Sequence, residues 1–224
     1  MSGAFYSAGS TEPPKVPGKY CLYGLKYSAN TQQVRLVLLT KNVPHELVNV
    51  NPKSIPDWYK KIQPDGQFPA FDTGNQVLVG ISDIIAYIDE KFPQPSLFPA
   101  GKDRKAVIAE IEQQLLPVAK DTKVMFDKKG ARTSQETHEV IKKLTERLES
   151  TGKPFLSGDT AGIGDFMVWP WIQMAQLSFK AHGGSADQGL QKVPKVAAWD
   201  KAMRSVKAVQ EVIVPEDEFL NLLK

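Results

Sequence analysis

The feature that most constrains the fold of this 224-residue chain is a change of pattern near residue 92. Residues 19–92 alternate short apolar runs with helical spacing, whereas residues 103–224 show helical spacing alone. Residues 93–102 separate the two regions and hold three prolines and a glycine, a composition typical of a linker. The sequence therefore predicts an α/β domain, a linker and an all-helical domain.

The first domain has a predicted order of β-α-β-α-β-β-α. Its elements are expected over residues 19–24, 31–41, 45–51, 54–62, 67–72, 76–80 and 82–92. Because the first two strands are joined by a helix, they should pair in parallel. The tight turn "TGN" between the last two strands predicts an antiparallel hairpin.

The second domain should contain helices alone. They are expected over residues 103–128 with a bend near Pro117, over 134–150, 163–182 and 194–213 as one or two helices, and in the final "PEDEFLNLLK". Residues 1–18 are rich in Gly, Ser, Pro and Thr and are predicted to form a mostly flexible tail.

Composition excludes several kinds of site. The net charge of +3 comes from scattered lysines, which argues against a nucleic-acid surface. No apolar run approaches the roughly 20 residues of a membrane span, and no secretory signal is recognisable, so a cytoplasmic protein is expected. The single cysteine, Cys21, should be a small buried apolar residue. His45, His138 and His182 are too far apart for ligand spacing, and no metal site is expected.

The stretch "DGQFPAF" places Pro69 at the entry of a predicted strand. Proline has no N–H to donate, which restricts it to edges, strand starts and turns. A cis Phe68–Pro69 bond would turn the backbone N–H and C=O of Phe68 sideways, where an extended peptide could pair with them. The alternative is an ordinary edge proline.

Several stretches together resemble the omega class of cytosolic glutathione transferases. They are "QVRLVLLTKNVPHELVNVN", "PDWYKKIQPDGQFPAF", "YIDEKFP", "GDFMVWPW" and "VPKVAAWDKAM". The resemblance covers about residues 19–224 and implies a thioredoxin-like first domain followed by an all-α domain. It also implies a cytoplasmic homodimer, with glutathione as co-substrate on the first domain and an electrophile or apolar ligand in a cleft facing the second.

The stretch "KYSANTQQVRLVLLTK" departs from that family at its reactive atom. Omega-class enzymes use a cysteine in a Cys-Pro-Phe turn, and ungapped alignment puts Ser28, Ala29 and Asn30 there. A serine cannot form a mixed disulfide with glutathione, but it can donate a hydrogen bond to the glutathione sulfur. Asn30 carries a second donor. Either residue activates the thiol, or both only form the turn and cap the helix.

Two further glutathione anchors of the family are changed. Ile55 stands where omega enzymes usually have a lysine for the glycine carboxylate of glutathione. The usual acidic–serine pair for the γ-glutamyl end falls on Gly80 and Ile81. A one-residue shift would use Ser82 and Asp83 instead; otherwise Ser82 is the N-cap of its helix.

Four side chains are candidates for the acceptor site: Tyr27, Trp169, Met174 and Phe219. The resemblance favours Tyr27 and Phe219 among them. Trp169 and Met174 form a stripe that fits a helical core equally well. Asp165 should tie the start of its helix to backbone N–H groups. Two hypotheses follow: a transferase with weak or absent thiol-transfer and dehydroascorbate reductase activity, or an inactive relative that carries an apolar ligand or serves as a crystallin-like or scaffold protein.

Overall fold

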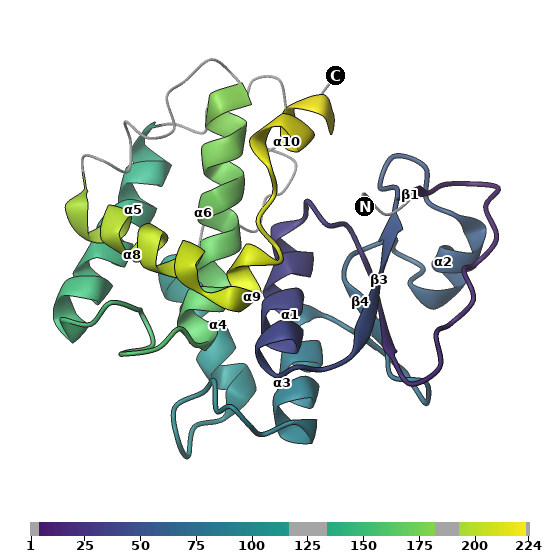
Figure 1. The fold of residues 1–224 in the computed structure, drawn as a ribbon, viewed down its shortest axis with the longest axis horizontal. Helices are drawn as coiled ribbons and strands as arrows, with labels where there is room; N and C mark the ends of the chain where they lie inside the picture. Colours follow the sequence, from purple (N-terminus) through teal and green to yellow (C-terminus); the bar gives the residue numbers. More distant parts are fainter. Residues whose placement is uncertain (1–4, 117–133, 182–192, 223–224) are drawn as a thin grey trace. The chain divides into compact units, whose positions relative to one another are not determined.

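The computed structural model describes residues 5–116, 134–181 and 193–222 (Figure 1). The chain divides into two compact units, Met1–Pro95 and Ser96–Lys224. The division falls within residues 93–102, where the sequence placed the linker.

The first unit is built on a five-stranded sheet of order β1-β3-β2-β4-β5. The strands are β1 Phe5–Tyr6, β2 Tyr20–Gly24, β3 His45–Val50, β4 Ala70–Asp72 and β5 Val77–Val79. Strand β3 runs parallel to β1 and β2, whereas β4 is antiparallel to both β2 and β5. The predicted parallel pair and antiparallel hairpin are therefore confirmed.

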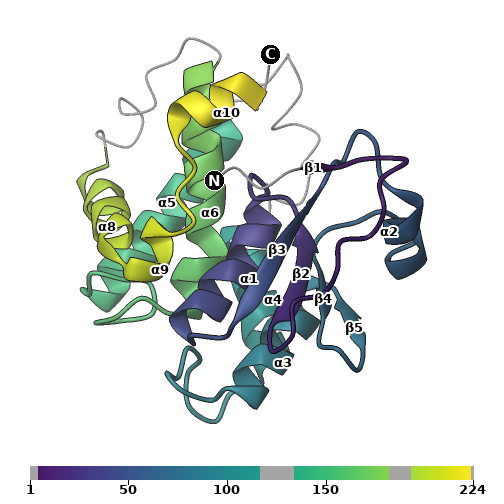
Figure 2. The same ribbon diagram turned by 45° about the vertical axis from the view of Figure 1, so that its right-hand side comes forward.

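Three helices cover this sheet: α1 Ala29–Thr40, α2 Asp57–Ile62 and α3 Ile81–Lys91. Helices α1 and α3 lie on one side of the sheet and α2 on the other (Figures 1 and 2). The buried face of α1 includes Val34, Val37 and Leu38, whose spacing of three and four residues places them on one side of a helix.

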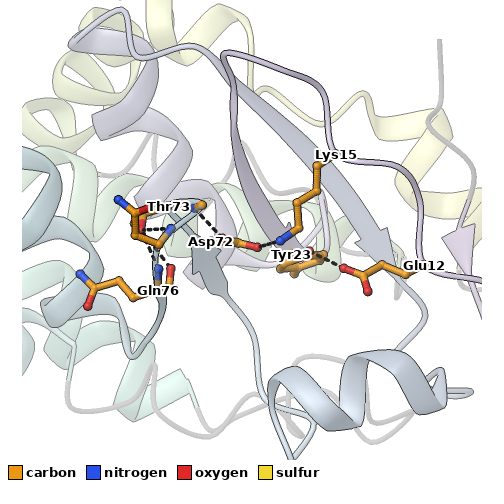
Figure 3. A network of polar contacts seen from close by, with 8 residues as sticks. Glu12, Lys15, Tyr23, Asp72, Thr73 and Gln76 are labelled. Carbon is orange, nitrogen blue, oxygen red and sulfur yellow. Dashed lines mark hydrogen bonds and ion pairs between the residues drawn. The ribbon is translucent and has the colours of Figure 1, made fainter.

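The N-terminal segment differs from the flexible tail that its composition predicted. Phe5 and Tyr6 form β1 beside β3. Further along, the Tyr23 hydroxyl donates to Glu12 at 3.0 Å, and Lys15 Nζ lies 2.5 Å from Asp72 Oδ2 (Figure 3). The expectation was wrong because strand β1 and Lys15 find their partners on β3 and β4, and local composition carries no signal of such distant pairing.

A buried lysine joins α1 to the end of α3. Lys41 Nζ lies 2.6 Å from Asp89 Oδ1, and it donates to the carbonyl oxygens of Phe92 at 2.7 Å and Pro95 at 2.8 Å. The exposed fractions of the Lys41 and Asp89 side chains are 0% and 5%. The lysine thus neutralises a buried carboxylate and binds the carbonyl of Phe92, the C-cap of α3. Its bond to Pro95 also holds the chain that follows the helix.

The α2 side of the sheet carries a cluster of buried residues, namely Cys21, Tyr23, Val48, Val50, Tyr59 and Ala70. Cys21 is buried, as predicted, and is a free thiol. Burial raises its pKa from 9.0 to about 11. Cys21 is therefore an apolar packing residue that stays protonated at neutral pH.

The regular elements among the described residues of the second unit are helices, and a single bridge pairs Phe155 with Gly158. Its helices are α4 Arg104–Leu115, α5 Ser134–Thr151, α6 Ile163–Ala181, α8 Pro194–Ser205, α9 Lys207–Gln210 and α10 Glu216–Leu222. The region 194–213 thus forms two helices. The expected bend near Pro117 lies outside the described residues.

Asp165 organises the start of α6. Its carboxylate accepts from the backbone N–H groups of Leu156, Ser157 and Gly162 at 2.8, 3.1 and 3.0 Å. The indole N–H of Trp199 donates to the same carboxylate at 2.8 Å. Four donors compensate this fully buried charge, and the structural role predicted for Asp165 is confirmed.

Candidate functional site

The strand register brings the candidate residues together at one end of the sheet, where several strands start or finish. Tyr23 pairs with Ala70, and Ala70 with Val79. Because these strands alternate in direction, β2 ends, β4 begins and β5 ends at the same edge. The chain then enters α1 after β2 and α3 after β5. The starts of two helices and the Phe68–Pro69 bond are therefore brought together.

Ser28 is the N-cap of α1, with an extended backbone at φ −88° and ψ 125°. Its N–H donates to Leu25 O at 2.8 Å, and its C=O accepts from Gln32 N at 2.9 Å. The half-buried hydroxyl makes no capping bond and has no hydrogen-bond partner among the described residues. Ser28 therefore holds the cap position while its hydroxyl remains available to a ligand.

Asn30 is the second residue of α1 and is half-buried. Within the described part of the chain, its side-chain amide has no hydrogen-bond partner. The alternative is that Ser28 and Asn30 only form the turn and cap the helix. Neither side chain makes a capping hydrogen bond to α1 within the residues that the structure describes.

The turn before Ser28 is held by side chains from two neighbouring elements. Thr31 Oγ1 on α1 accepts from Leu25 N at 3.2 Å, and Asn49 Oδ1 on β3 accepts from Lys26 N at 2.9 Å. Gly24 completes the arrangement, because a Cβ at this position would lie 2.6 Å from the Thr31 side chain. Only glycine lets the strand end pack this closely against the helix start.

The Phe68–Pro69 bond is cis. The Phe68 ring stacks on Tyr59 with centroids 5.1 Å apart, and the Tyr59 hydroxyl donates to Gln67 O at 2.6 Å. Among the described residues, the backbone N–H and C=O of Phe68 make no hydrogen bond. They therefore match the pairing groups that the proline motif indicated.

Helix α3 begins differently from the expectation. Gly80 is its N-cap at φ 86°, a left-handed conformation that favours glycine, and Ser82 is the second helical residue. The interpretation of Ser82 as N-cap is therefore wrong, and Ser82 lies half-buried in the first turn. Exposed Asp83 follows it, with Oδ2 3.4 Å from the position of a Cβ on Gly80.

The positions of the other expected anchors carry no charge. Ile55 packs against the buried cluster on the α2 side and nearly fills the space beside Gly66, where a Cβ would lie 2.6 Å from Ile55 Cδ1. Gly80 and Ile81 form the start of α3. What remains at this edge is the positive end of two helix dipoles, which favours bound carboxylate and thiolate groups.

The four acceptor-site candidates have different surroundings. Tyr27 is buried and stacks on Phe5 with centroids 6.0 Å apart, and Lys26 Nζ lies 4.8 Å from its ring centroid. Trp169 is fully buried in the helical unit, and its indole N–H donates to Asp200 at 2.9 Å. This placement speaks against a pocket role for Trp169 and favours the core alternative, because none of its surface is exposed.

Met174 and Phe219 are also buried in the helical unit.

Nothing in the sequence indicated Phe5, Thr31 and Asn49, which support the turn before Ser28. The pattern around them carried no signal, since each is an ordinary strand or helix residue in its own segment.

The described residues contain no group of three or more His, Cys, Asp or Glu side chains that could hold a metal ion. None of the described helices combines the length and the apolar character needed to cross a membrane.

Comparison with known proteins gives a consistent result. The family described as "Glutathione S-transferase, N-terminal domain" matches residues 22–96, and "Glutathione S-transferase, C-terminal domain" matches residues 130–202. Glutathione S-transferase omega-1 of Mus musculus is 30% identical over 205 residues, covering 88% of this chain and 81% of the relative. Glutathione S-transferase omega-2 of Rattus norvegicus is 28% identical over 224 residues, covering 96% and 87%.

A solved structure has the same fold. The tau class glutathione S-transferase from mango, Mangifera indica, aligns with a TM-score of 0.76 at 20% identity, covering 92% of this chain and 98% of the mango chain.

Proposed function

Because this chain belongs to the glutathione transferase family, with omega-class relatives, we propose that it conjugates glutathione to small electrophilic molecules. The observation that carries this proposal is the hydroxyl of Ser28 at the N-terminus of α1, which makes no hydrogen bond within the described part of the chain. Glutathione would pair with the backbone of Phe68 beside cis-Pro69 and place its sulfur near Ser28 or Asn30. Ser82 and Asp83, in the first turn of α3, would meet its γ-glutamyl end.

The size of the required pKa shift supports this proposal. A thiol of pKa about 8.5 must be lowered by about two units to be largely ionised at neutral pH, which needs roughly 2.7 kcal/mol. One hydrogen bond to a charged group contributes about 1.5–3 kcal/mol, and a helix N-terminus adds up to about 1 kcal/mol. The upper part of these ranges reaches the requirement, so a strong Ser28 hydrogen bond together with the α1 N-terminus would ionise the thiol.

Thiol transfer and dehydroascorbate reduction should be weak or absent. Both require a cysteine that exchanges disulfides with glutathione, and Ser28 cannot do so. Cys21, the single cysteine, cannot replace it, because its thiol is buried on β2 with a pKa of about 11.

A second candidate function is binding without turnover, as in a ligand carrier, a crystallin-like protein or a scaffold. The placement of Ile55 in apolar packing and the start of α3 at Gly80 and Ile81 favour it. Loss of two charge-assisted contacts, about 1.5–3 kcal/mol each, would weaken glutathione binding roughly a hundredfold or more.

The deciding experiment is calorimetric titration with glutathione, combined with conjugation of chlorodinitrobenzene. Saturable glutathione binding together with conjugate formation supports the transferase. Absence of both would refute the transferase and favour the non-catalytic function. Ser28→Ala should lower the conjugation rate about tenfold or more, and Asn30→Ala serves as the matched variant. An unchanged rate in Ser28→Ala would move the role to Asn30 or to the backbone.

We also propose a cytoplasmic homodimer, as the family resemblance implies. Light scattering coupled to gel filtration measures the mass against the 24.8 kDa of one chain. A mass of one chain at micromolar concentration would refute the dimer.

A further inference from the structure

We infer that Phe5, in the N-terminal strand, is a positioning residue that holds the turn carrying Ser28 by stacking on Tyr27. The effect of Phe5 on glutathione rests on the proposed function, in which the turn at Ser28 activates the glutathione thiol. It adds the N-terminal segment, which was expected to be a tail, to the glutathione site.

The strand register places Phe5 at the edge of the sheet where Ser28 lies. Phe5 pairs with Asn49 across β1 and β3, and Asn49 pairs with Gly24 across β3 and β2. These three residues therefore form one row, and β2 leaves that row directly into the turn. Asn49 is 4% exposed and accepts from Lys26 N at 2.9 Å, so the row already holds one end of the turn.

Phe5 supplies the second hold on the turn. Its ring lies nearly parallel to that of Tyr27, at 18° with centroids 6.0 Å apart. Lys26 Nζ also lies against the Tyr27 ring, 4.8 Å from its centroid. Tyr27 is 4% exposed, so the residue directly before Ser28 is fixed by packing and not by the turn backbone alone.

The strand is in turn anchored away from the site. Asn51 N donates to Tyr6 O at 2.9 Å, and Ala8 N donates to Ser54 O at 2.8 Å. Phe5 therefore presents its ring from a fixed strand, as a positioning group must.

The consequence concerns the direction of the Ser28 hydroxyl and of the first α1 N–H groups. A hydrogen bond to a thiolate weakens steeply when its angle falls, so a loose turn would stabilise the thiolate less. Loss of the ring at position 5 should therefore affect the ionisation of a thiol at this place, and not only the stability of the fold.

The test uses the full chain and two readouts. In a Ser28→Cys background, the pKa of the introduced thiol is measured from its ultraviolet absorbance and its alkylation rate against pH; Cys21, with a pKa of about 11, does not interfere. In the Ser28 chain, the Kd of glutathione is measured by calorimetry.

Adding Phe5→Ala should raise the pKa of the introduced thiol by about half a unit, the order of the helix N-terminus effect. In the Ser28 chain, Phe5→Ala should weaken glutathione about two- to tenfold, the range of one aromatic pair. Phe5→Tyr keeps the ring and should restore both values.

The matched control is Tyr6→Leu on the opposite face of β1. Tyr6 contacts Trp58 with centroids 6.1 Å apart and belongs to the α2 side. This variant should lower the thermal midpoint and leave the pKa of the introduced thiol unchanged.

The outcomes separate the two proposals. If glutathione does not bind the Ser28 chain but Phe5→Ala still shifts the pKa of the introduced thiol, the proposed function fails and the positioning role stands. If glutathione binds but Phe5→Ala leaves both readouts unchanged, the positioning role is refuted and the function stands. Equal pKa shifts in Phe5→Ala and Tyr6→Leu would also refute it, because they would show a general loss of stability.

Discussion

The buried ion pair between Lys41 and Asp89 offers a quantitative prediction about stability. Lys41→Met keeps the length of the side chain but removes its charge and both donors to the carbonyl groups of Phe92 and Pro95. The Asp89 carboxylate, 5% exposed, then loses a cation 2.6 Å away. Breaking a buried pair in this way costs about 3–5 kcal/mol, because an uncompensated charge stays inside the protein.

The assay is urea unfolding followed by circular dichroism. With a slope of about 2 kcal/mol per M, a loss of about 4 kcal/mol lowers the midpoint by about 2 M. Amide hydrogen exchange should localise the loss to α1 and α3, which the pair joins. The matched control is Lys60→Met, since Lys60 and Asp57 form an exposed pair at 3.0 Å with exposed fractions of 54% and 87%. It should change the free energy of unfolding by about 0–1 kcal/mol.

The double variant Lys41→Met/Asp89→Leu separates loss of the ion pair from the cost of leaving the Asp89 carboxylate unpaired. It removes both charges, so it should be more stable than Lys41→Met alone even though one more native side chain is lost. Equal losses in Lys41→Met and Lys60→Met, or a double variant less stable than the single one, would contradict the assignment of the cost to the unpaired Asp89 carboxylate.

Three further predictions concern other sites. Because the pKa of Cys21 rises from 9.0 to about 11 on folding, the folded chain keeps a proton that the unfolded chain loses, and the free energy of unfolding should fall by about 2.7 kcal/mol as pH rises from about 9 past 11. Urea midpoints measured across this range should fall less in Cys21→Ala, and equal pH dependence in both proteins would rule out the thiol as the cause. Gly24→Ala places a Cβ 2.6 Å from the Thr31 side chain and should cost about 1–3 kcal/mol and weaken glutathione binding; Thr31→Ala in the same chain should recover part of both losses in thermal melts and calorimetry. Trp169→Phe removes the indole donor to Asp200 and should lower the free energy of unfolding by about 1–3 kcal/mol without changing the glutathione Kd, whereas a changed Kd would return Trp169 to the list of site residues.

Much of the fold was readable from local patterns. The order of strands and helices in the first unit follows from apolar periodicity and turn residues, and each predicted element there is present within a few residues of its expected bounds. Helix α3 is an instructive case: the spacing of Ile84, Ile85 and Ile88 in the sequence marks its buried face, whereas nothing in that spacing marks its first residue. The start depends on the backbone of Gly80, and periodicity does not report backbone conformation.

The candidate site was readable only in part. Ser28 and Phe68–Pro69 were found because a helix start and a strand-entry proline are signalled by neighbouring residues. Trp169 was placed among acceptor candidates because a tryptophan on a helix gives the same pattern in a core and in a pocket. Its full burial and its bond to Asp200, 31 positions away, favour the core.

The sequence by itself determined the two-part organisation, the order of elements and the replacement of the expected cysteine by Ser28, since these depend on residue identity and on spacing over a few positions. Tertiary structure alone decided that the N-terminal segment joins the sheet, that Phe5 stacks on Tyr27 and that Asn49 holds the turn before Ser28. The physical reason is that strand pairing and side-chain packing join groups more than 20 positions apart, and local propensity holds no record of which distant residue becomes a neighbour.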